Sequence, residues 1–363
     1  MLVAIAVSIA VSACASESPS PSGAASTHPS ASEAPSSTPT PSPSPSPTPE
    51  PTPVALCPLT GLPVSDPAVL TQPTLLVQVE NHWDARPPLN LIAADLVIEA
   101  PVEGDVTRYS ALYLCNPLPS EAGPIRSARY YNVDLWQQMH VLTVCFGAST
   151  GAQARFRAAG MPIVNGITGL WPWFFRGAGY APHNLYGDLA DLRAAIGQNQ
   201  GLTDRVAATG VLRPPFVFSP LSTFALGDPV GKMTIWTNRY WHYGWRWDTS
   251  VQLWQRMEDT GPLTDRSTGE PIRARNVIVQ VVQVDIAYGD PDPGGNPRRE
   301  LHLVGAGTGY LYVEGTVREL RWSRPSADAV TSWTYAATGD PVVLRPGRVW
   351  WEIIGTNAVV NNE

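Results

Sequence analysis

Residues 15–53 consist almost wholly of Ser, Thr, Pro, Ala and Glu, and this run limits how much of the chain can fold. It holds 12 of the 37 prolines, a single Gly, and neither Lys nor Arg. Such a segment buries too little apolar surface to offset the entropy of ordering it, so we expect a disordered Ser/Pro-rich tether. Folded structure is therefore expected in residues 54–363, which hold all 13 tryptophans.

An apolar stretch, MLVAIAVSIAVSA, precedes the tether. Its 13 residues match the length of a signal-peptide core and are too few to span a bilayer. The stretch ends in Val11-Ser12-Ala13 before Cys14, which resembles the bacterial lipobox, where the cysteine takes a diacylglyceryl group. We therefore expect residues 1–14 to be a lipoprotein signal peptide and Cys14 to be lipidated. No Lys or Arg precedes the stretch, which leaves an ordinary cleaved signal or a short uncleaved anchor as alternatives.

An acylated Cys14 would make the lipid bilayer a partner of the protein. More than one acyl chain holds a protein stably on a membrane. The 39 residues of the tether, if extended like polyproline, reach up to about 120 Å. We expect the folded part to lie at the cell membrane, lipid-anchored and facing the extracytoplasmic side.

Charge and motif content exclude several classes of function. The net charge is −7 and three of the acids lie in the tether, so no basic surplus indicates nucleic acid as a partner. The chain has no phosphate-binding loop, no dinucleotide fingerprint and no His-rich metal motif, so neither a cofactor nor a metal ion is expected.

The pattern of the folded part changes at Pro214-Pro215. Before it, β-branched runs such as 74–80 alternate with helical patterns, which predicts a mixed α/β half over residues 54–212. After it, short β-like runs separated by Gly or Pro predict a β-rich half over residues 213–363. The expected fold class is α+β, with two halves that are able to share a sheet. Helices are predicted from a cap at Ser127 to about Met139, over 151–160, and over 184–198 with Asn184 or Tyr186 near its start.

Three cysteines follow Cys14, without metal-ligand spacing. Cys115 and Cys145 both lie in strand-like segments and are able to pair if those strands are neighbours, which an exported location permits. Two buried free thiols are the favoured interpretation.

Several segments resemble recurring blocks of the YerB-like lipoprotein family. They are CPLTGLP at 57–63, LVIEAPVEG at 96–104, TRY at 107–109, GPIRSARYY at 123–131, APHNLY at 181–186, NVIVQ at 276–280 and GAGTGYLY at 305–312. The resemblance covers nearly all of residues 57–354, in order, with both the N-terminal and the C-terminal regions of the family. It implies an α+β fold and a membrane-anchored envelope location, and no reaction.

Charged side chains gather near the predicted strand ends and the first predicted helix start: Glu99, Glu103, Asp105, Arg108, Arg126, Ser127 and Arg129. Guanidinium forks beside free backbone N–H groups suit a phosphate or a carboxylate. The hypothesis is an anion pocket in which the three arginines and Ser127 bind, and Glu99 or Glu103 orients them or acts as a base. The alternative is a structural network of arginine–carboxylate pairs, with Ser127 as a helix cap.

His183 and Asn184 form the second candidate site. A histidine is suited to proton transfer near neutral pH, so His183 is proposed as a catalytic or ligand residue. Asn184 binds the ligand in the same hypothesis, and in the alternative it is a helix cap. The nearby Trp171, Trp173, Phe174 and Phe175 either form a sugar-stacking face or, as we favour, pack in the core.

Two functions follow from these features. The first is an extracytoplasmic cell-envelope binding module for an anionic or glycan ligand, such as a cell-wall polymer, or for an envelope protein partner. The alternative is a transferase or hydrolase that acts on lipid-linked or cell-wall phosphate or glycan substrates through an Arg/Glu/His pocket. It draws on Thr107-Arg108 and Arg126-Ser127-Ala128-Arg129, which resemble the arginine-rich pyrophosphate pocket of the LytR-CpsA-Psr ligases.

Overall fold

The computed structural model describes residues 54–169, 172–219, 227–238 and 241–363. The predicted signal peptide, Cys14, the tether and Trp171 lie outside the described residues. From Pro53 to Glu363 the chain forms one compact unit. Among the helices of the described part, none has the length and apolar character needed to cross a bilayer.

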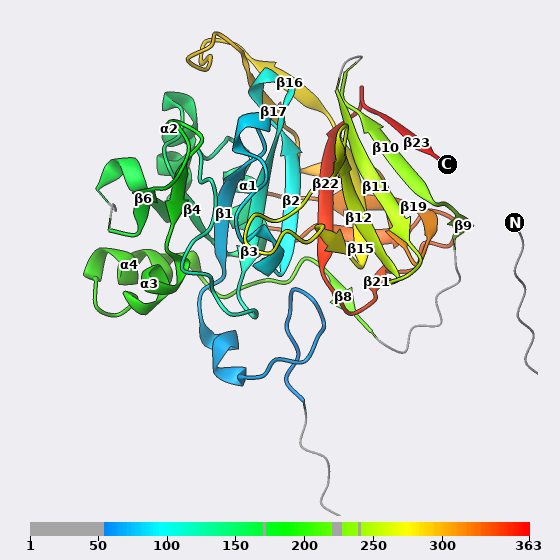
Figure 1. Ribbon diagram of the computed structural model, residues 1–363, viewed down its shortest axis with the longest axis horizontal. Helices are drawn as coiled ribbons and strands as arrows, with labels where there is room; N and C mark the ends of the chain where they lie inside the picture. The colour runs from blue at the N-terminus through cyan, green and yellow to red at the C-terminus, as the bar shows by residue number, and fades with distance from the viewer. Residues whose placement is uncertain (1–53, 170–171, 220–226, 239–240) are drawn as a thin grey trace, which may run out of the picture. The chain divides into compact units, whose positions relative to one another are not determined.

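A large mixed sheet forms the centre of the unit (Figure 1). In spatial order its strands are β20 (Ser332–Tyr335), β19 (Thr316–Arg324), β18 (Gly305–Val313), β15 (Asn276–Val282), β22 (Val349–Gly355), β2 (Leu96–Pro101), β3 (Thr107–Tyr113), β1 (Leu75–Glu80), β4 (Leu142–Cys145) and β5 (Ile163–Asn165), with β9 (Asp228–Pro229) paired to β19. The run expected as a strand over 74–80 is β1, whose six residues are all buried, as in a sheet covered on both faces.

Strand β22, the last strand of the large sheet along the chain, joins the two halves of the chain. It pairs in parallel with β15 of the second half and with β2 of the first half. In Figure 1 this strand, drawn in red, lies beside the cyan β2. One sheet therefore continues from residues near 75 to residues near 350, and the halves share it.

A second, smaller sheet packs against the large one. Its strands are β13 (Gly261–Pro262), β12 (Leu253–Glu258), β11 (His242–Asp248), β10 (Lys232–Trp236) and β23 (Val359–Asn362), with β14 (Arg273–Ala274) paired to β12. Three further two-stranded pairs are β16 (Val284–Ala287) with β17 (Arg298–Leu301), β6 (Phe174–Arg176) with β7 (Leu185–Gly187), and β8 (Val217–Phe218) with β21 (Val343–Leu344).

The large sheet carries a core on each face. On one face, Leu76 and Leu112 pack in the same cluster as Leu135 of the first helix. On the opposite face, Val77 packs in the same cluster as Trp245 of the small sheet. Because side chains alternate along a strand, neighbouring residues of β1, β2 and β3 face different cores.

Four α-helices lie in the described residues, all between 132 and 209. They are α1 (Asn132–Met139), α2 (Thr150–Ala159), α3 (Leu189–Ala194) and α4 (Gln200–Thr209), and single 3-10 turns are η1 (Pro67–Thr71), η2 (Trp83–Ala85), η3 (Leu91–Ala93), η4 (Glu103–Asp105) and η5 (Gly166–Thr168). The α+β class is confirmed, and the helix content is lower than the sequence pattern predicts.

Two helix starts were predicted wrongly. The helix expected from Ser127 begins at Asn132, and Ser127 instead donates its hydroxyl to the carbonyl of Phe146 at 3.1 Å. The helix expected from Asn184 begins at Leu189, with Asp188 as its cap, because residues 185–187 pair with β6 as a strand. Of the aromatic run, Trp173 and Phe174 are buried in the core.

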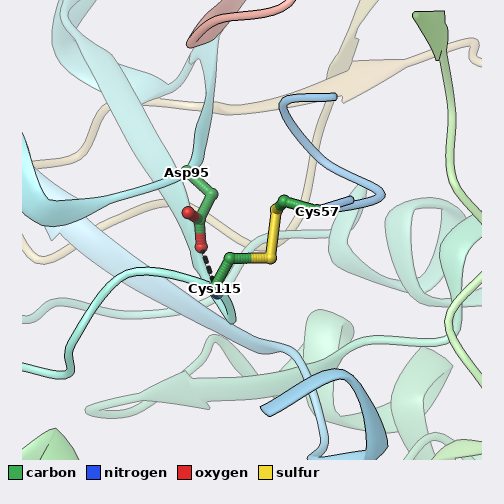
Figure 2. A group of neighbouring side chains, drawn as sticks. All are labelled: Cys57, Asp95 and Cys115. Atoms are coloured by element: carbon green, nitrogen blue, oxygen red, sulfur yellow. Dashed lines mark hydrogen bonds between the residues drawn. A yellow bond between two sulfur atoms is a disulfide. The ribbon is translucent and has the colours of Figure 1, made fainter. Parts of the chain in front are cut away.

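The pairing of the cysteines also differs from the expectation. Cys115 forms a disulfide with Cys57 (Figure 2), while Cys145 is a buried free thiol. The bond attaches the entry of the folded unit to the chain just beyond β3. The carboxylate of Asp95 accepts the N–H of Cys115 at 2.8 Å and that of Leu114 at 2.7 Å, which fixes this end of the bond.

Candidate functional site

One edge of the large sheet gathers most of the predicted site residues. Glu80 is the last residue of β1, and it pairs in register with Arg108 at the start of β3. The segment that follows Gly123 runs beside β1, where Arg126 N–H donates to the Gln78 carbonyl at 2.8 Å. The same segment also contacts the chain near residue 185, where the Ile125 N–H donates to the Leu185 carbonyl at 2.6 Å. Three segments distant in sequence therefore meet at this edge.

Four arginines lie at the edge with two carboxylates, and we call this set the arginine cluster: Arg108, Arg126, Arg129, Arg298, Glu80 and Glu103. Arg126 Nε is 3.0 Å from Glu80 Oε1. Arg129 Nε donates to Glu103 Oε2 at 2.8 Å, and Arg298 Nη1 donates to Glu103 Oε1. Within this set four guanidinium groups face two carboxylates, and the carboxylates of Asp290 and Asp292 lie near enough to Arg298 for its charge to lower their pKa.

Glu103 is held as an anion. Burial alone would raise the pKa of its carboxyl, but the charges and hydrogen bond of Arg129 and the charge of Arg298 outweigh burial and lower that pKa. A carboxylate fixed between two guanidinium groups is a weak proton acceptor. Glu103 therefore suits the role of orienting the arginines better than the role of a base.

Arg108 is the unusual member of the arginine cluster. It is 4% exposed, yet within the described ranges no carboxylate lies within 4 Å of its guanidinium. Its Nη1 donates to the Ser127 carbonyl at 3.3 Å, and its Nε has no hydrogen-bond partner in the described part of the chain. Burial and the neighbouring charge of Arg129 lower its pKa to about 9, which leaves it a cation at neutral pH. A buried cation without a paired anion is costly to the fold.

His183 joins the same edge through Glu80. Its Nδ1 is 3.2 Å from Glu80 Oε1, and its ring stacks on that of His82 at 4.8 Å between centroids. Asp84 Oδ2 lies 3.4 Å from His82 Nδ1 and 4.0 Å from His183 Nε2. One ligand atom from each of His82, Asp84 and His183 lies within 4.8 Å of the others, so these residues are able to hold a metal ion.

Asn184 positions the loop that carries His183. Its Oδ1 accepts from Arg176 Nη1 at 3.0 Å, and its Nδ2 donates to the carbonyls of Gly177 at 3.0 Å and Gly179 at 3.2 Å. Ser127 contributes its carbonyl, which accepts from Arg129 Nη1 at 2.7 Å. Asn184 therefore holds the backbone of the loop before His183, and Ser127 holds the guanidinium of Arg129 through its backbone carbonyl.

Glu99 is not brought together with the arginine cluster. It pairs with Tyr109 across β2 and β3, whereas Arg108 pairs with Ala100, so Glu99 faces the opposite core. There it accepts from Arg256 Nη2 at 2.8 Å and from Trp350 Nε1 at 3.1 Å. Glu99 belongs to a buried network between the two sheets.

Four residues of the edge were missed by the sequence analysis: Glu80, His82, Asp84 and Arg298. The available signal was the polar run ENHWD, which follows directly on a buried strand, where loop-borne ligand groups often lie. Arg298 carried no signal, because it reaches Glu103 across 195 positions of sequence.

The chain matches two family models along most of its folded length. Residues 59–202 match the model described as "Protein of unknown function (DUF3048) N-terminal domain", and residues 232–351 match the corresponding C-terminal domain. The chain is 28% identical over 300 residues to "Putative lipoprotein YerB" of Bacillus subtilis (strain 168), which covers 82% of this chain and 85% of the relative. The crystal structure of the Bacillus subtilis YerB protein superposes with a TM-score of 0.70 at 26% identity, covering 85% of this chain and 99% of that structure.

Proposed function

Because the chain belongs to the DUF3048 family, with both of its domains, we propose that it is a lipid-anchored extracytoplasmic protein that binds an anionic ligand of the cell envelope at the arginine cluster. The observation that carries the ligand is Arg108, a buried guanidinium without a carboxylate within 4 Å in the described part of the chain. Arg126 lies beside it with its side chain 31% exposed, which gives a ligand access. Guanidinium forks match the oxygens of phosphate and carboxylate groups.

Three observations support the location. The relative's printed name is that of a lipoprotein, and the chain carries the expected lipidation cysteine, Cys14, before an extended tether. The disulfide between Cys57 and Cys115 suits an oxidising compartment outside the cytoplasm.

We expect Cys14→Ser to release the protein from the membrane. The mature wild-type chain should begin at Cys14 with an added diacylglyceryl mass, measured by mass spectrometry, and should fractionate with membranes. The variant should appear in the medium or periplasmic fraction. A wild-type chain that begins elsewhere without a lipid would contradict the anchor.

We expect Arg108→Met to abolish anion binding while making the fold more stable. The substitution removes an unpaired buried cation and fills its space with an apolar side chain, so the free energy of unfolding should rise by about 1–3 kcal/mol. Arg126→Gln should lower the affinity for inorganic pyrophosphate at least about tenfold, as expected for a lost charged hydrogen bond. Isothermal calorimetry measures binding, and urea unfolding measures stability.

The control is Arg321→Gln, an arginine on β19 whose side chain is 58% exposed, which should change neither quantity. Retention on purified cell-wall material, with and without its phosphate polymers, separates a phosphate ligand from a carboxylate ligand. Pyrophosphate and wall material that bind wild type and Arg108→Met equally would overturn the proposal.

A transferase or hydrolase acting on lipid-linked or cell-wall phosphate is the second candidate. The contact of His183 Nδ1 with Glu80, 3.2 Å apart and next to Arg126, favours it because it provides a group suited to proton transfer beside an anion site. Phosphate release from a polyprenyl pyrophosphate by wild type, and its loss in His183→Ala, would support this candidate. No release by wild type would leave binding alone.

A further inference from the structure

We infer that His82, Asp84 and His183 form a site for a divalent transition metal, Zn²⁺ or an ion of similar preference, with Glu80 as the partner that orients His183. The inference goes beyond the proposed anion binding and does not depend on it. Two imidazoles and a carboxylate are a ligand set that suits zinc and related first-row ions.

The distances are close to those that a metal requires. Ligand atoms around a tetrahedral zinc ion, each about 2.0–2.1 Å from the metal, lie about 3.3 Å from one another. Asp84 Oδ2 is 3.4 Å from His82 Nδ1 and 4.0 Å from His183 Nε2, and one ligand atom from each of the three residues lies within 4.8 Å of the others. The side chains of Asp84 and His82 are 37% and 25% exposed, so both have room for the small rotation that closes the site, in which His82 Nδ1 gives up the Asp84 N–H that it accepts at 3.3 Å.

Glu80 is placed to orient His183 when a metal ion binds. Its Oε1 lies 3.2 Å from His183 Nδ1, so Nε2 is the nitrogen that faces Asp84, and a small rotation of the ring would turn the 3.2 Å contact into a hydrogen bond, because Nδ1 has no hydrogen-bond partner in the described part of the chain. A ligating histidine commonly gives its other ring N–H to a carboxylate, which fixes the tautomer and raises the basicity of the ligand nitrogen. Glu80 is itself fixed by its position at the end of β1 and by Arg126 at 3.0 Å.

Backbone contacts hold the ligands near one another before any ion binds. His82 precedes η2, and its carbonyl accepts the Ala85 N–H at 2.9 Å. The His183 N–H donates to the Tyr180 carbonyl at 2.9 Å, closing the turn that presents the ring. The two segments meet where the His82 and His183 rings stack, with 20° between their planes.

An ordinary ion pair explains the arrangement less well. Glu80 already contacts a permanent cation, Arg126, so it does not need His183 for charge balance. In the described part of the chain, no Arg or Lys lies within 4 Å of Asp84, whose side chain contacts the two imidazole rings and the hydroxyl of Tyr180. A carboxylate balanced only by two imidazoles gains its counter-charge when a cation binds.

Cobalt titration of the full chain, purified without a polyhistidine tag and in buffer free of phosphate, tests the site. We expect one Co²⁺ per chain with visible absorption bands of tetrahedral strength, displaced by Zn²⁺. His82→Ala and His183→Ala should each weaken binding at least about a hundredfold, and Glu80→Gln about 10–100-fold. His302→Ala, an exposed histidine paired with Asp285, is the matched control and should bind as wild type does.

Two results would overturn the site: no saturable Co²⁺ binding by wild type, or unchanged binding in the double variant His82→Ala/His183→Ala with a native circular dichroism spectrum. The cobalt titration contains no phosphate, so a negative result says nothing about anion binding at the arginine cluster. The pyrophosphate experiment tests anion binding separately.

Discussion

Arg256→Met is expected to lower the free energy of unfolding by about 3–5 kcal/mol. Arg256 on β12 is fully buried, and its Nη2 and Nε donate to Glu99 at 2.8 and 3.1 Å. It also lies 3.9 Å from Glu352, the residue in register with Glu99 on the neighbouring parallel strand. The guanidinium is the cation between these two fully buried carboxyl groups, and its loss leaves Glu99 buried without a counter-charge.

Two further variants, Arg246→Met and Glu352→Gln, test whether the loss in Arg256→Met comes from the missing charge of Arg256. Arg246→Met on β11 removes an exposed arginine and should change stability by less than about 0.5 kcal/mol. Burial and the adjacent Glu99 raise the pKa of Glu352 well above its ordinary value, which favours the neutral acid. Glu352→Gln imitates that neutral acid and should cost far less than Arg256→Met. Urea unfolding followed by tryptophan fluorescence measures all three, and equal losses for the two arginine variants would contradict the network.

A local pattern was sufficient for strand β1. The β-branched run of 74–80 becomes β1, since it is apolar and bounded by turns. Helix starts failed because a local cap signal competes with pairing. Ser127 satisfies the carbonyl of Phe146 across a neighbouring segment, so the hydroxyl serves tertiary structure instead of α1.

The candidate site was predictable only in part, for a reason of geometry. The sequence analysis grouped Arg108, Arg126, Arg129 and Glu103 near predicted strand ends and the first predicted helix start, and the structure brings these side chains together. Glu99 was grouped with them because it is near in sequence, although alternation along β2 sends it to the other face. Its true partner, Arg256, lies 157 positions away and becomes a neighbour only when the small sheet packs on the large one.

The order of the strands in the large sheet also depends on contacts between segments that are distant in the sequence. No local signal in Val349–Gly355 shows that this strand lies between β15 and β2. Because β22 lies between β15 and β2, one sheet runs through both halves of the chain, although the pattern of the sequence changes near residue 213.

Removing the disulfide is the second large expected effect. The variant Cys57→Ser/Cys115→Ser should lose about 4 kcal/mol of unfolding free energy, because the bond closes a loop between residues separated by 58 positions and so restricts the unfolded chain. Dithiothreitol should lower the urea midpoint of wild type to that of the variant and should leave the variant unchanged. Cys145→Ala removes a buried thiol without a cross-link and should keep the sensitivity to dithiothreitol.

Thiol counting supplies the contrary outcome. In denaturant without reductant, a Cys14→Ser chain should show one reactive thiol, Cys145, whereas three would mean that no bond exists.

The position of the disulfide also relates it to the proposed membrane anchor. Cys57 lies only four residues after the predicted tether ends at Pro53, so force carried by such a tether would first reach the covalent link to Cys115. Without the bond, the same force would act on the short turn at residues 57–61, which is held by two hydrogen bonds to the Cys57 carbonyl. In the variant without the bond, we expect added protease to cleave this entry segment first.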